Sequence, residues 1–315
     1  MNSPSLTFGP IPSRRLGRSL GINNIPPKVC TYSCIYCQVG RTSRFQVERG
    51  EFYNPEDISK SVKSRVKKIR EKGERIDFLT FVPDGEPTLD MNLGVEIELL
   101  KPIGIKIAVI SNGSLIWDES VVNDLMMTDW VSLKVDAVSD DIWRRINRPH
   151  KALNHQSVLE GIIAFSGNYD GEIATETMLI EGVNESIEEI EKIACFIKDV
   201  SPSTAYISIP TRPPAESYVR PADEEKINLA FQTFKEAGIN TECIIGFEGT
   251  EFGHTGDVVE DLLSILSVHP MRRDAVEEFL RKVGAVWEVV DELLEEEKIR
   301  EVEYQNSRFY IRTIK

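Results

Sequence analysis

The stretch Cys30-Thr31-Tyr32-Ser33-Cys34-Ile35-Tyr36-Cys37 places three cysteines within eight residues, in the pattern C-x3-C-x2-C. The other two cysteines of the chain, Cys195 and Cys243, stand alone far downstream. Three thiolates can hold a [4Fe-4S] cluster and leave one iron open to a small molecule. On the motif alone, a zinc site or inert thiols remain alternative interpretations, although structural zinc usually takes four ligands in two pairs.

The 315-residue chain has the composition of a globular protein, with 41% hydrophobic and 28% charged residues. Its length suits one large α/β unit with a small appendage. It contains no apolar run of about 18 residues, and its first ten residues lack the features of a signal peptide. The few, clustered cysteines fit a reducing compartment. We therefore expect a cytoplasmic protein that makes no use of a membrane.

The net charge of −14 is unevenly distributed along the chain. Residues 1–50 contain seven Arg or Lys residues and a single Glu, so the remainder is strongly acidic and would repel a nucleic-acid backbone. We expect a basic collar around the cysteines that binds phosphate or carboxylate groups of an anionic substrate. Salt bridges to the acidic body are the alternative role for the arginines. The candidate substrate residues are Arg14, Arg15, Arg18, Arg41, Arg212 and His150.

Helical and strand-like periodicities alternate along most of the chain, which predicts repeated β-α units and a parallel sheet with helices outside it. Periodicity does not distinguish an open sheet from a full or partial barrel. The Gly-, Pro- and Arg-rich residues 8–18 are expected to form a surface loop. Strands are expected at 19–25, 76–82, 105–110, 130–135, 173–180, 205–209 and 241–245, and helices at 55–72, 93–101, 118–127, 155–166, 187–200 and 222–237.

Polar motifs follow several of the predicted strands at their carboxyl ends, where the chemistry of parallel sheets is found. Each motif alone is common turn chemistry. Their shared position after successive strands predicts that they meet at one rim. They are Pro-Asp-Gly-Glu-Pro-Thr at 83–88, Ser-Asn-Gly-Ser at 111–114, Lys134 with Asp136, and Pro-Thr-Arg-Pro-Pro at 210–214.

The cysteine spacing, with an aromatic residue before the third cysteine, resembles the radical S-adenosylmethionine (SAM) superfamily. The resemblance covers roughly residues 10–250 and implies a partial (β/α)6 barrel in which Cys30, Cys34 and Cys37 hold a [4Fe-4S] cluster. It further implies that SAM binds the open iron and is cleaved by an electron from the cluster. The resulting 5'-deoxyadenosyl radical then abstracts hydrogen from a substrate.

The same resemblance implies contacts to SAM and an electron donor of the flavodoxin or ferredoxin type. Asp84 stands where the family often has a glycine. No residue is singled out as catalytic in its own right. The implied SAM contacts are Tyr36, Gly85, Glu86, Pro87, Ser111, Asn112, Lys134 and Asp136.

A closer resemblance is to the iron-sulfur oxidoreductase group that includes the archaeal wybutosine synthase. It rests on Pro12-Ser13-Arg14-Arg15-Leu16-Gly17, on Tyr36-Cys37-Gln38 and on Arg145-Ile146-Asn147-Arg148-Pro149. Wybutosine synthase has a second cluster held by upstream cysteines, whereas no cysteine precedes Cys30 in this sequence. A tRNA-base-modifying enzyme is therefore an alternative function. An iron-sulfur redox sensor that binds DNA through its C-terminal domain is another.

The C-terminal part predicts a winged helix-turn-helix domain over residues 257–315. Helical patterns at 258–266, 274–283 and 286–297 are followed by two strand patterns, at 299–304 and 308–314. The glycine-rich residues 249–256 are expected to link this domain to a barrel domain over residues 1–248. The acidic last helix argues against nucleic acid and favours peptide or protein docking, or packing against the barrel. Its acidic residues are Glu288, Asp291, Glu292, Glu295, Glu296 and Glu297.

Overall fold

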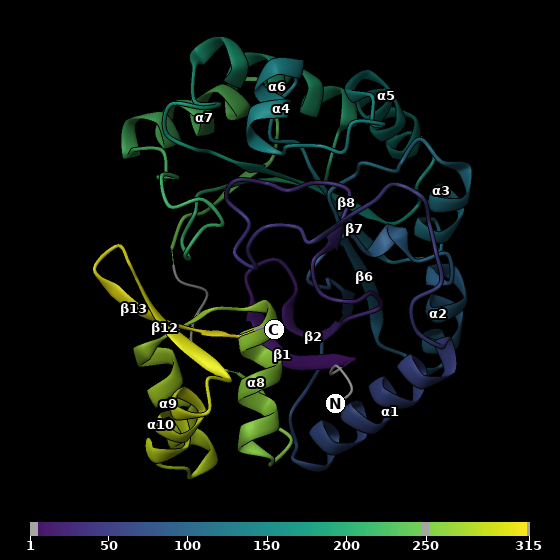
Figure 1. Ribbon diagram of the computed structural model, residues 1–315. Coiled ribbons are helices and arrows are strands. Elements are labelled where there is room, and N and C mark those ends of the chain that lie inside the picture. The colour runs from purple at the N-terminus through teal and green to yellow at the C-terminus, as the bar shows by residue number, and fades with distance from the viewer. Residues whose placement is uncertain (1–5, 247–251, 314–315) are drawn as a thin grey trace.

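The computed structural model describes residues 6–246 and 252–313 of the chain. Its main body is an eight-stranded sheet with the strand order β1-β2-β5-β6-β7-β8-β9-β10. Figure 1 shows this sheet curled into a half barrel with helices around its outside. The predicted α/β class and partial barrel are therefore confirmed. None of the described helices is long and apolar enough to cross a membrane.

Most strands and helices lie within a few residues of their predicted bounds; α4 was not predicted. The strands of the main sheet are β1 (Thr7–Ser13), β2 (Gly17–Ile22), β5 (Phe78–Phe81), β6 (Lys106–Ser111), β7 (Trp130–Lys134), β8 (Glu172–Met178), β9 (Thr204–Ser208) and β10 (Thr241–Ile244). The surrounding helices are α1 (Pro55–Glu71), α2 (Leu93–Leu100), α3 (Glu119–Leu125), α4 (Asp140–Ile146), α5 (His155–Ser166), α6 (Ile187–Val200) and α7 (Glu224–Glu236).

The strands from β2 to β10 in this sheet pair in parallel, with Leu20 opposite Leu79 and Val109 opposite Val131. Their side chains are mostly buried because helices cover the sheet. Parallel strands end at a common edge, so the loops after β5, β6 and β7 meet at the mouth of the half barrel. This is the rim that the polar motifs predicted.

The prediction of a surface loop at residues 8–18 is wrong. These residues form most of β1 and the start of β2, which pair antiparallel from Thr7 opposite Ile22 to Ser13 opposite Gly17. Prolines in β1 are tolerated because β1 is the edge strand of the sheet. Its burial comes from a segment more than 200 residues away in the sequence, which local periodicity cannot reveal.

That distant segment is the C-terminal unit, which consists of α8 (Val258–Val268), α9 (Arg273–Val283), α10 (Glu288–Glu295) and a small sheet in the order β11-β13-β12. The sheet contains β11 (Met271–Arg272), β12 (Ile299–Tyr304) and β13 (Ser307–Arg312). Phe8 and Ile11 of β1 share a hydrophobic core with Phe252 and Leu262. Phe252, which lies in the predicted linker, is fully buried, whereas residues 247–251 lie outside the described residues.

A buried ion pair joins the C-terminal unit to the barrel. Arg65 of α1 and Asp261 of α8 approach to 2.8 Å, with side chains only 5% and 0% exposed. The Arg65 Nε group also donates to the Gly9 carbonyl at 3.0 Å, and Asp261 accepts from the Thr255 amide at 2.6 Å. These contacts hold β1, α1 and α8 together, although the three elements are distant in the sequence.

Candidate active site

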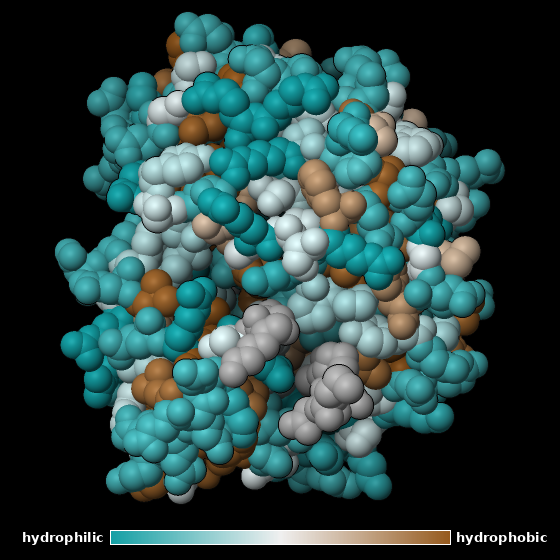
Figure 2. All heavy atoms as spheres, in the orientation of Figure 1, coloured by the Kyte–Doolittle hydropathy of each residue, from teal (hydrophilic) through white to brown (hydrophobic). Residues whose placement is uncertain are grey.

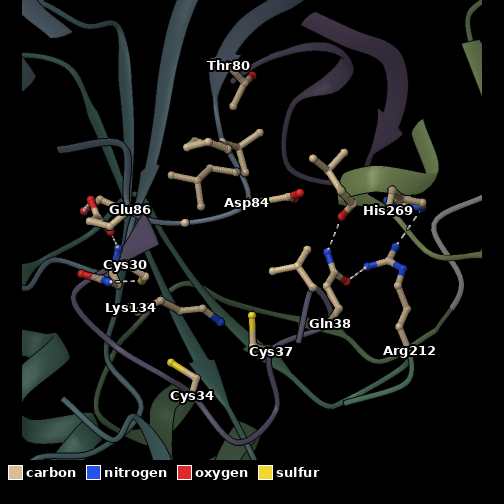
Figure 3. Close-up of a pocket in the computed structure, with 18 of the residues that line it drawn as sticks. Cys30, Cys34, Cys37, Gln38, Thr80, Asp84, Glu86, Lys134, Arg212 and His269 are labelled. Atoms are coloured by element: carbon tan, nitrogen blue, oxygen red, sulfur yellow. Dashed lines mark hydrogen bonds between the residues drawn. The ribbon is translucent and has the colours of Figure 1, made fainter. Parts of the chain in front are cut away.

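A cavity of about 290 Å³ lies between the mouth of the half barrel, the cysteine loop and the C-terminal unit. Figure 3 shows residues of the half barrel and of the C-terminal unit around this cavity, including all three clustered cysteines. The predicted site residues that line this cavity are Cys30, Cys34, Cys37, Tyr36, Gly85, Glu86, Ser111, Asn112, Lys134, Arg15 and Arg212. The tertiary structure therefore brings together motifs that are separated by up to about 200 residues in the sequence.

Backbone hydrogen bonds hold the cysteine loop across the barrel mouth. The Ser33 amide donates to the Asn147 carbonyl at 3.0 Å, and the Ile35 amide donates to the Ile146 carbonyl at 3.0 Å. At its start, β3 (Val29–Cys30) pairs in parallel with β4 (Arg44–Phe45). The loop is thus held from both sides, which gives the three thiols defined positions.

Two side-chain amides point at the sulfur atoms of the cysteine loop. Asn147 Nδ2 lies 3.5 Å from Cys34 Sγ, and Asn112 Nδ2 lies 3.6 Å from Cys30 Sγ. Burial raises the pKa of Cys34 to about 12, with nearby Asp136 adding to the effect. A thiolate in this setting requires a compensating positive charge, which a bound iron centre provides. The donor set therefore fits a metal cluster.

The spacing of the thiols matters for the kind of metal centre. Among the described residues, no three His, Cys, Asp or Glu side chains converge closely enough to hold a single metal ion. In a [4Fe-4S] cluster each thiolate binds a different iron, so the ligands stand further apart than around one ion. Figure 3 shows the Cys34 and Cys37 side chains and the Lys134 ammonium directed at the same space.

Gly85 allows the loop after β5 to pass directly beneath β3. The Lys28 amide donates to the Asp84 carbonyl at 2.6 Å, and the Glu86 amide donates to the Val29 carbonyl at 3.1 Å. A Cβ atom at Gly85 would lie only 2.0 Å from the Val29 carbonyl oxygen. Only glycine permits this approach, which couples the rim to the residue beside Cys30.

The Glu86 carboxylate joins two rim loops to each other. It accepts hydrogen bonds from the Ser111 hydroxyl at 2.8 Å and the Asn112 amide at 2.7 Å, as well as from the amide and hydroxyl of Thr88. Burial raises the pKa of Glu86 while these hydrogen bonds oppose the rise. Glu86 therefore positions Ser111 and Asn112 at the cavity. Pro87, in the 3-10 turn Pro87–Leu89, does not line it.

Lys134 at the end of β7 belongs to a buried ionic group that the sequence did not reveal. Its ammonium lies 2.9 Å from Glu176 Oε1, and Arg15 forms an ion pair with the other oxygen of Glu176. Burial disfavours the charged carboxylate, but Arg15 and Lys134 together hold the pKa of Glu176 at about 2. A lone glutamate within an otherwise uncharged predicted strand was the signal that could have identified Glu176.

Tyr36 and Asp136 contact each other at the side of the cavity. The Tyr36 hydroxyl donates to Asp136, and the Lys134 ammonium lies 5.2 Å from the centre of the Tyr36 ring. Asp136 also accepts from Asn147 Nδ2 at 2.8 Å and from the Met178 amide at 2.9 Å. Its oxygens are therefore occupied, and Asp136 does not line the cavity.

The structure does not bring the predicted basic collar together at the cavity: of the candidate substrate residues only Arg15 and Arg212 line it, beside Lys28. Arg18 forms an ion pair with Glu74, and Arg41 with Glu216. His150 accepts from the Ala152 amide at 3.3 Å. These partners come from later, acidic segments, so the ion pairs depend on tertiary structure. Arg14 lies beside Gly246, away from the cavity lining.

The C-terminal unit contributes one wall of the cavity. Gln38 Nε2 donates to the Val268 carbonyl at 3.0 Å, and Arg212 Nη1 donates to Gln38 Oε1 at 2.8 Å. Arg212 Nη2 lies 3.2 Å from His269 Nε2. Burial, together with the Arg212 charge, holds the pKa of His269 well below its usual range. The residue after Cys37 is thus connected to α8, a contact that the sequence could not predict.

Asp84 is a buried carboxyl residue of the cavity with an unsatisfied oxygen. The residue is 4% exposed, and Oδ1 has no hydrogen-bond partner among the described residues. Burial raises the pKa of Asp84 to about 8, although Lys28 and Arg312 act in the opposite direction. In Figure 3 its carboxyl group points away from the cysteines, toward the wall that contains His269. An unsatisfied buried carboxyl in a cavity is a candidate ligand contact.

Comparisons with known proteins agree with this geometry. Residues 24–197 match the Radical SAM superfamily. The chain is 49% identical over 313 residues to a UPF0026 protein of Methanocaldococcus jannaschii, covering 99% of this chain and 97% of that protein. A radical SAM methyltransferase from Sphaerobacter thermophilus shares the fold, with a TM-score of 0.54 and 16% identity over 72% of this chain and 66% of that one.

A second solved structure shows the same fold with a cofactor named in its description. It is that of Streptococcus suis SuiB bound to S-adenosylmethionine, with a TM-score of 0.52 and 12% identity over 71% of this chain and 49% of that one. The superfamily consists of enzymes that use a [4Fe-4S] cluster and SAM. By its matching sequence, its half barrel and its three-cysteine loop at the barrel mouth, this chain belongs to the radical SAM superfamily.

Proposed function

We propose that this enzyme holds its [4Fe-4S] cluster on Cys30, Cys34 and Cys37 and removes a hydrogen atom from a substrate in the adjoining cavity. The observation that carries the proposal is that all three thiols line one cavity together with the polar ends of β5, β6 and β7. When bound, the cluster supplies the electron that cleaves SAM and so generates the 5'-deoxyadenosyl radical. The fold supplies orientation and excludes water from the reacting atoms.

The proposed SAM site is the part of the cavity next to the cysteines. We assign the rim residues Gly85, Glu86, Ser111 and Asn112, which line the cavity, to one side of SAM, with Pro87 behind them in the 3-10 turn. Tyr36 and Lys134 form the other side, and Asp136 acts from behind by holding the Tyr36 hydroxyl. The hydrogen bonds that Glu86 accepts from the Ser111 hydroxyl and the Asn112 backbone amide support this assignment. They hold two rim loops in one arrangement before SAM binds.

The experiment that tests the proposal is anaerobic reconstitution with iron and sulfide, followed by incubation with dithionite and SAM. We expect chromatography to show 5'-deoxyadenosine, and none when dithionite is omitted. If a fully reconstituted cluster produces no 5'-deoxyadenosine, the proposed function is wrong. A gel shift on DNA that follows the state of the cluster would instead support the redox-sensor alternative.

We further propose that Asp84 contacts the substrate rather than the cluster. One oxygen of its carboxyl group, Oδ1, has no hydrogen-bond partner among the described residues, and the group points toward the C-terminal wall. A substrate with an N–H or O–H group at this position would satisfy Asp84 and so gain affinity, because an unpaired buried polar group is costly. Arg15 and Arg212, which also line the cavity, are the proposed contacts for an anionic group of the same substrate.

Replacing Asp84 with asparagine tests this role through stability. Because the pKa of Asp84 is raised by burial, the folded wild type keeps a proton that the unfolded chain releases, so its stability falls as pH rises from about 4 to about 8. We expect Asp84→Asn to have a higher free energy of unfolding than wild type above pH 8, and the difference to be smaller near pH 4. Urea denaturation of the apoprotein measures both values. Equal pH profiles would contradict the buried, unpaired state of Asp84.

The C-terminal unit is proposed to be a winged helix, and the chain to divide into 1–248, 249–256 and 257–315. Three helices followed by the β12–β13 hairpin support this assignment. Because Val268 and His269 line the cavity, we assign this domain a role in enclosing the substrate.

The cluster's need for reducing conditions supports a cytoplasmic location. Modification of a tRNA base remains the alternative reaction, and transfer of label from substrate C–H positions into 5'-deoxyadenosine would distinguish the substrates.

A further inference from the structure

The cysteine loop has an outer face that does not line the cavity. We call the surface formed by Arg41, Arg44, Phe45, Arg148 and Tyr218 the cysteine-loop face. Arg148 is half-buried and the other four are exposed: 71% for the Arg41 side chain, 41% for Phe45 and 59% for Tyr218. None of them lines the cavity described above. A partner on this face would therefore leave SAM and substrate in place.

Backbone contacts place this face directly against the cysteines. Phe45 is the cross-strand partner of Cys30, and the Gln46 amide donates to the Cys30 carbonyl at 3.3 Å. Neighbouring strands are about 4.8 Å apart, so the exposed Phe45 lies one strand spacing from a proposed cluster ligand. On its other side the Phe45 ring packs edge-on against His150, with 5.2 Å between ring centres.

The charge of this face is opposite to that of the protein as a whole. Glu216 accepts from both Arg41 and Arg148, so two cations share one carboxylate. The Arg44 guanidinium lies 5.8 Å from the centre of the Phe52 ring, and within the described part of the chain it forms no ion pair. The face thus keeps positive charge on a protein whose net charge is −14.

The cysteine-loop face contains two exposed aromatic side chains, Phe45 and Tyr218, among its arginines. On the face of the molecule that Figure 2 shows, most side chains are hydrophilic and hydrophobic ones lie among them. A surface of this kind is better suited to a transient partner than to a permanent subunit, because permanent interfaces are more apolar. Charge attraction would guide such a transient partner to the surface. Exposed arginines around an aromatic residue are the side chains that such interfaces favour.

We propose that the cysteine-loop face is the docking surface for an acidic one-electron donor protein of the flavodoxin kind. The inference rests on the proposed function, since it requires a cluster on Cys30, Cys34 and Cys37. In the step, the donor loses one electron and the cluster gains it. No covalent bond forms or breaks. Positive charge attracts the acidic donor, and Phe45 gives it contact next to Cys30.

The test compares two reductants on the reconstituted enzyme. One is photoreduced flavodoxin, which must dock, and the other is photoreduced 5-deazariboflavin, a small neutral donor that need not. Stopped-flow absorbance follows reduction of the cluster. We expect Arg44→Glu to slow reduction by flavodoxin about tenfold at low salt, with the difference shrinking as salt is added. Phe45→Ser should slow it as well, and both variants should match wild type with 5-deazariboflavin.

Lys63→Glu is the matched control, because Lys63 is an exposed lysine on α1 and its reversal changes net charge equally. The proposal would be overturned if flavodoxin reduced the cluster of Arg44→Glu and Phe45→Ser as fast as that of the wild-type enzyme. It would also be overturned if the two reductants reduced the cluster of these variants with equal slowing. Loss of tRNA binding in Arg44→Glu with unchanged flavodoxin rates would assign the face to RNA and overturn it too. The proposed function is tested separately: it is wrong if the enzyme forms no 5'-deoxyadenosine from SAM after 5-deazariboflavin has reduced the cluster.

Discussion

Replacing Cys34 with alanine should leave a folded protein that no longer assembles its cluster and forms no 5'-deoxyadenosine above background. The remaining two thiolates cannot hold three irons of the cluster. Folding should persist because the loop is held by backbone hydrogen bonds from Ser33 and Ile35, which the substitution does not touch. Iron and sulfide analysis, together with the visible absorbance of the reconstituted protein, measures the effect.

Cys195→Ala is the control for this prediction, because Cys195 is exposed on α6 and far from the cysteine loop in the sequence. That variant should retain the full iron content and wild-type formation of 5'-deoxyadenosine. The ligand assignment would be wrong if a variant with all three loop cysteines replaced by alanine still bound the full complement of iron and sulfide.

Asp261→Ala should lower the free energy of unfolding by about 3–5 kcal/mol, the usual loss when one partner of a buried ion pair is removed. Arg65 would keep its charge in a buried site, and the Thr255 amide would lose its acceptor. Burial already lowers the pKa of Arg65, with Asp261 acting against that effect. Chemical denaturation followed by circular dichroism measures the difference.

Arg281→Ala gives the comparison for a surface pair. Arg281 is 76% exposed and contacts Glu278 one turn away on α9, so its removal should change the free energy of unfolding by less than about 0.5 kcal/mol. A loss below about 1 kcal/mol in Asp261→Ala would show that the pair does not fasten α8 to α1. Replacing both Arg65 and Asp261 with apolar residues should recover much of the lost stability.

Local sequence was sufficient for the repeated β-α units, because each parallel strand and helix carries its own apolar pattern. It also indicated the polar ends of β5, β6 and β7, since turn residues follow each strand directly. It failed for β1, where glycine and proline suggested a loop although the strand is buried by α8. It could not decide between the two roles given to the basic collar, because the salt bridges of Arg18 and Arg41 are made with carboxylates from distant segments.

By itself the sequence determined the cluster motif, the α/β class and the order of the rim loops, since these depend on spacing and on patterns of a few residues. Tertiary structure decided which residues share the cavity. Glu176, His269 and the unpaired Asp84 gain their roles only through contacts across the barrel and the C-terminal unit. The reason is physical: the burial and pairing of a charge depend on the neighbours that folding brings to it, and those neighbours lie far away along the chain.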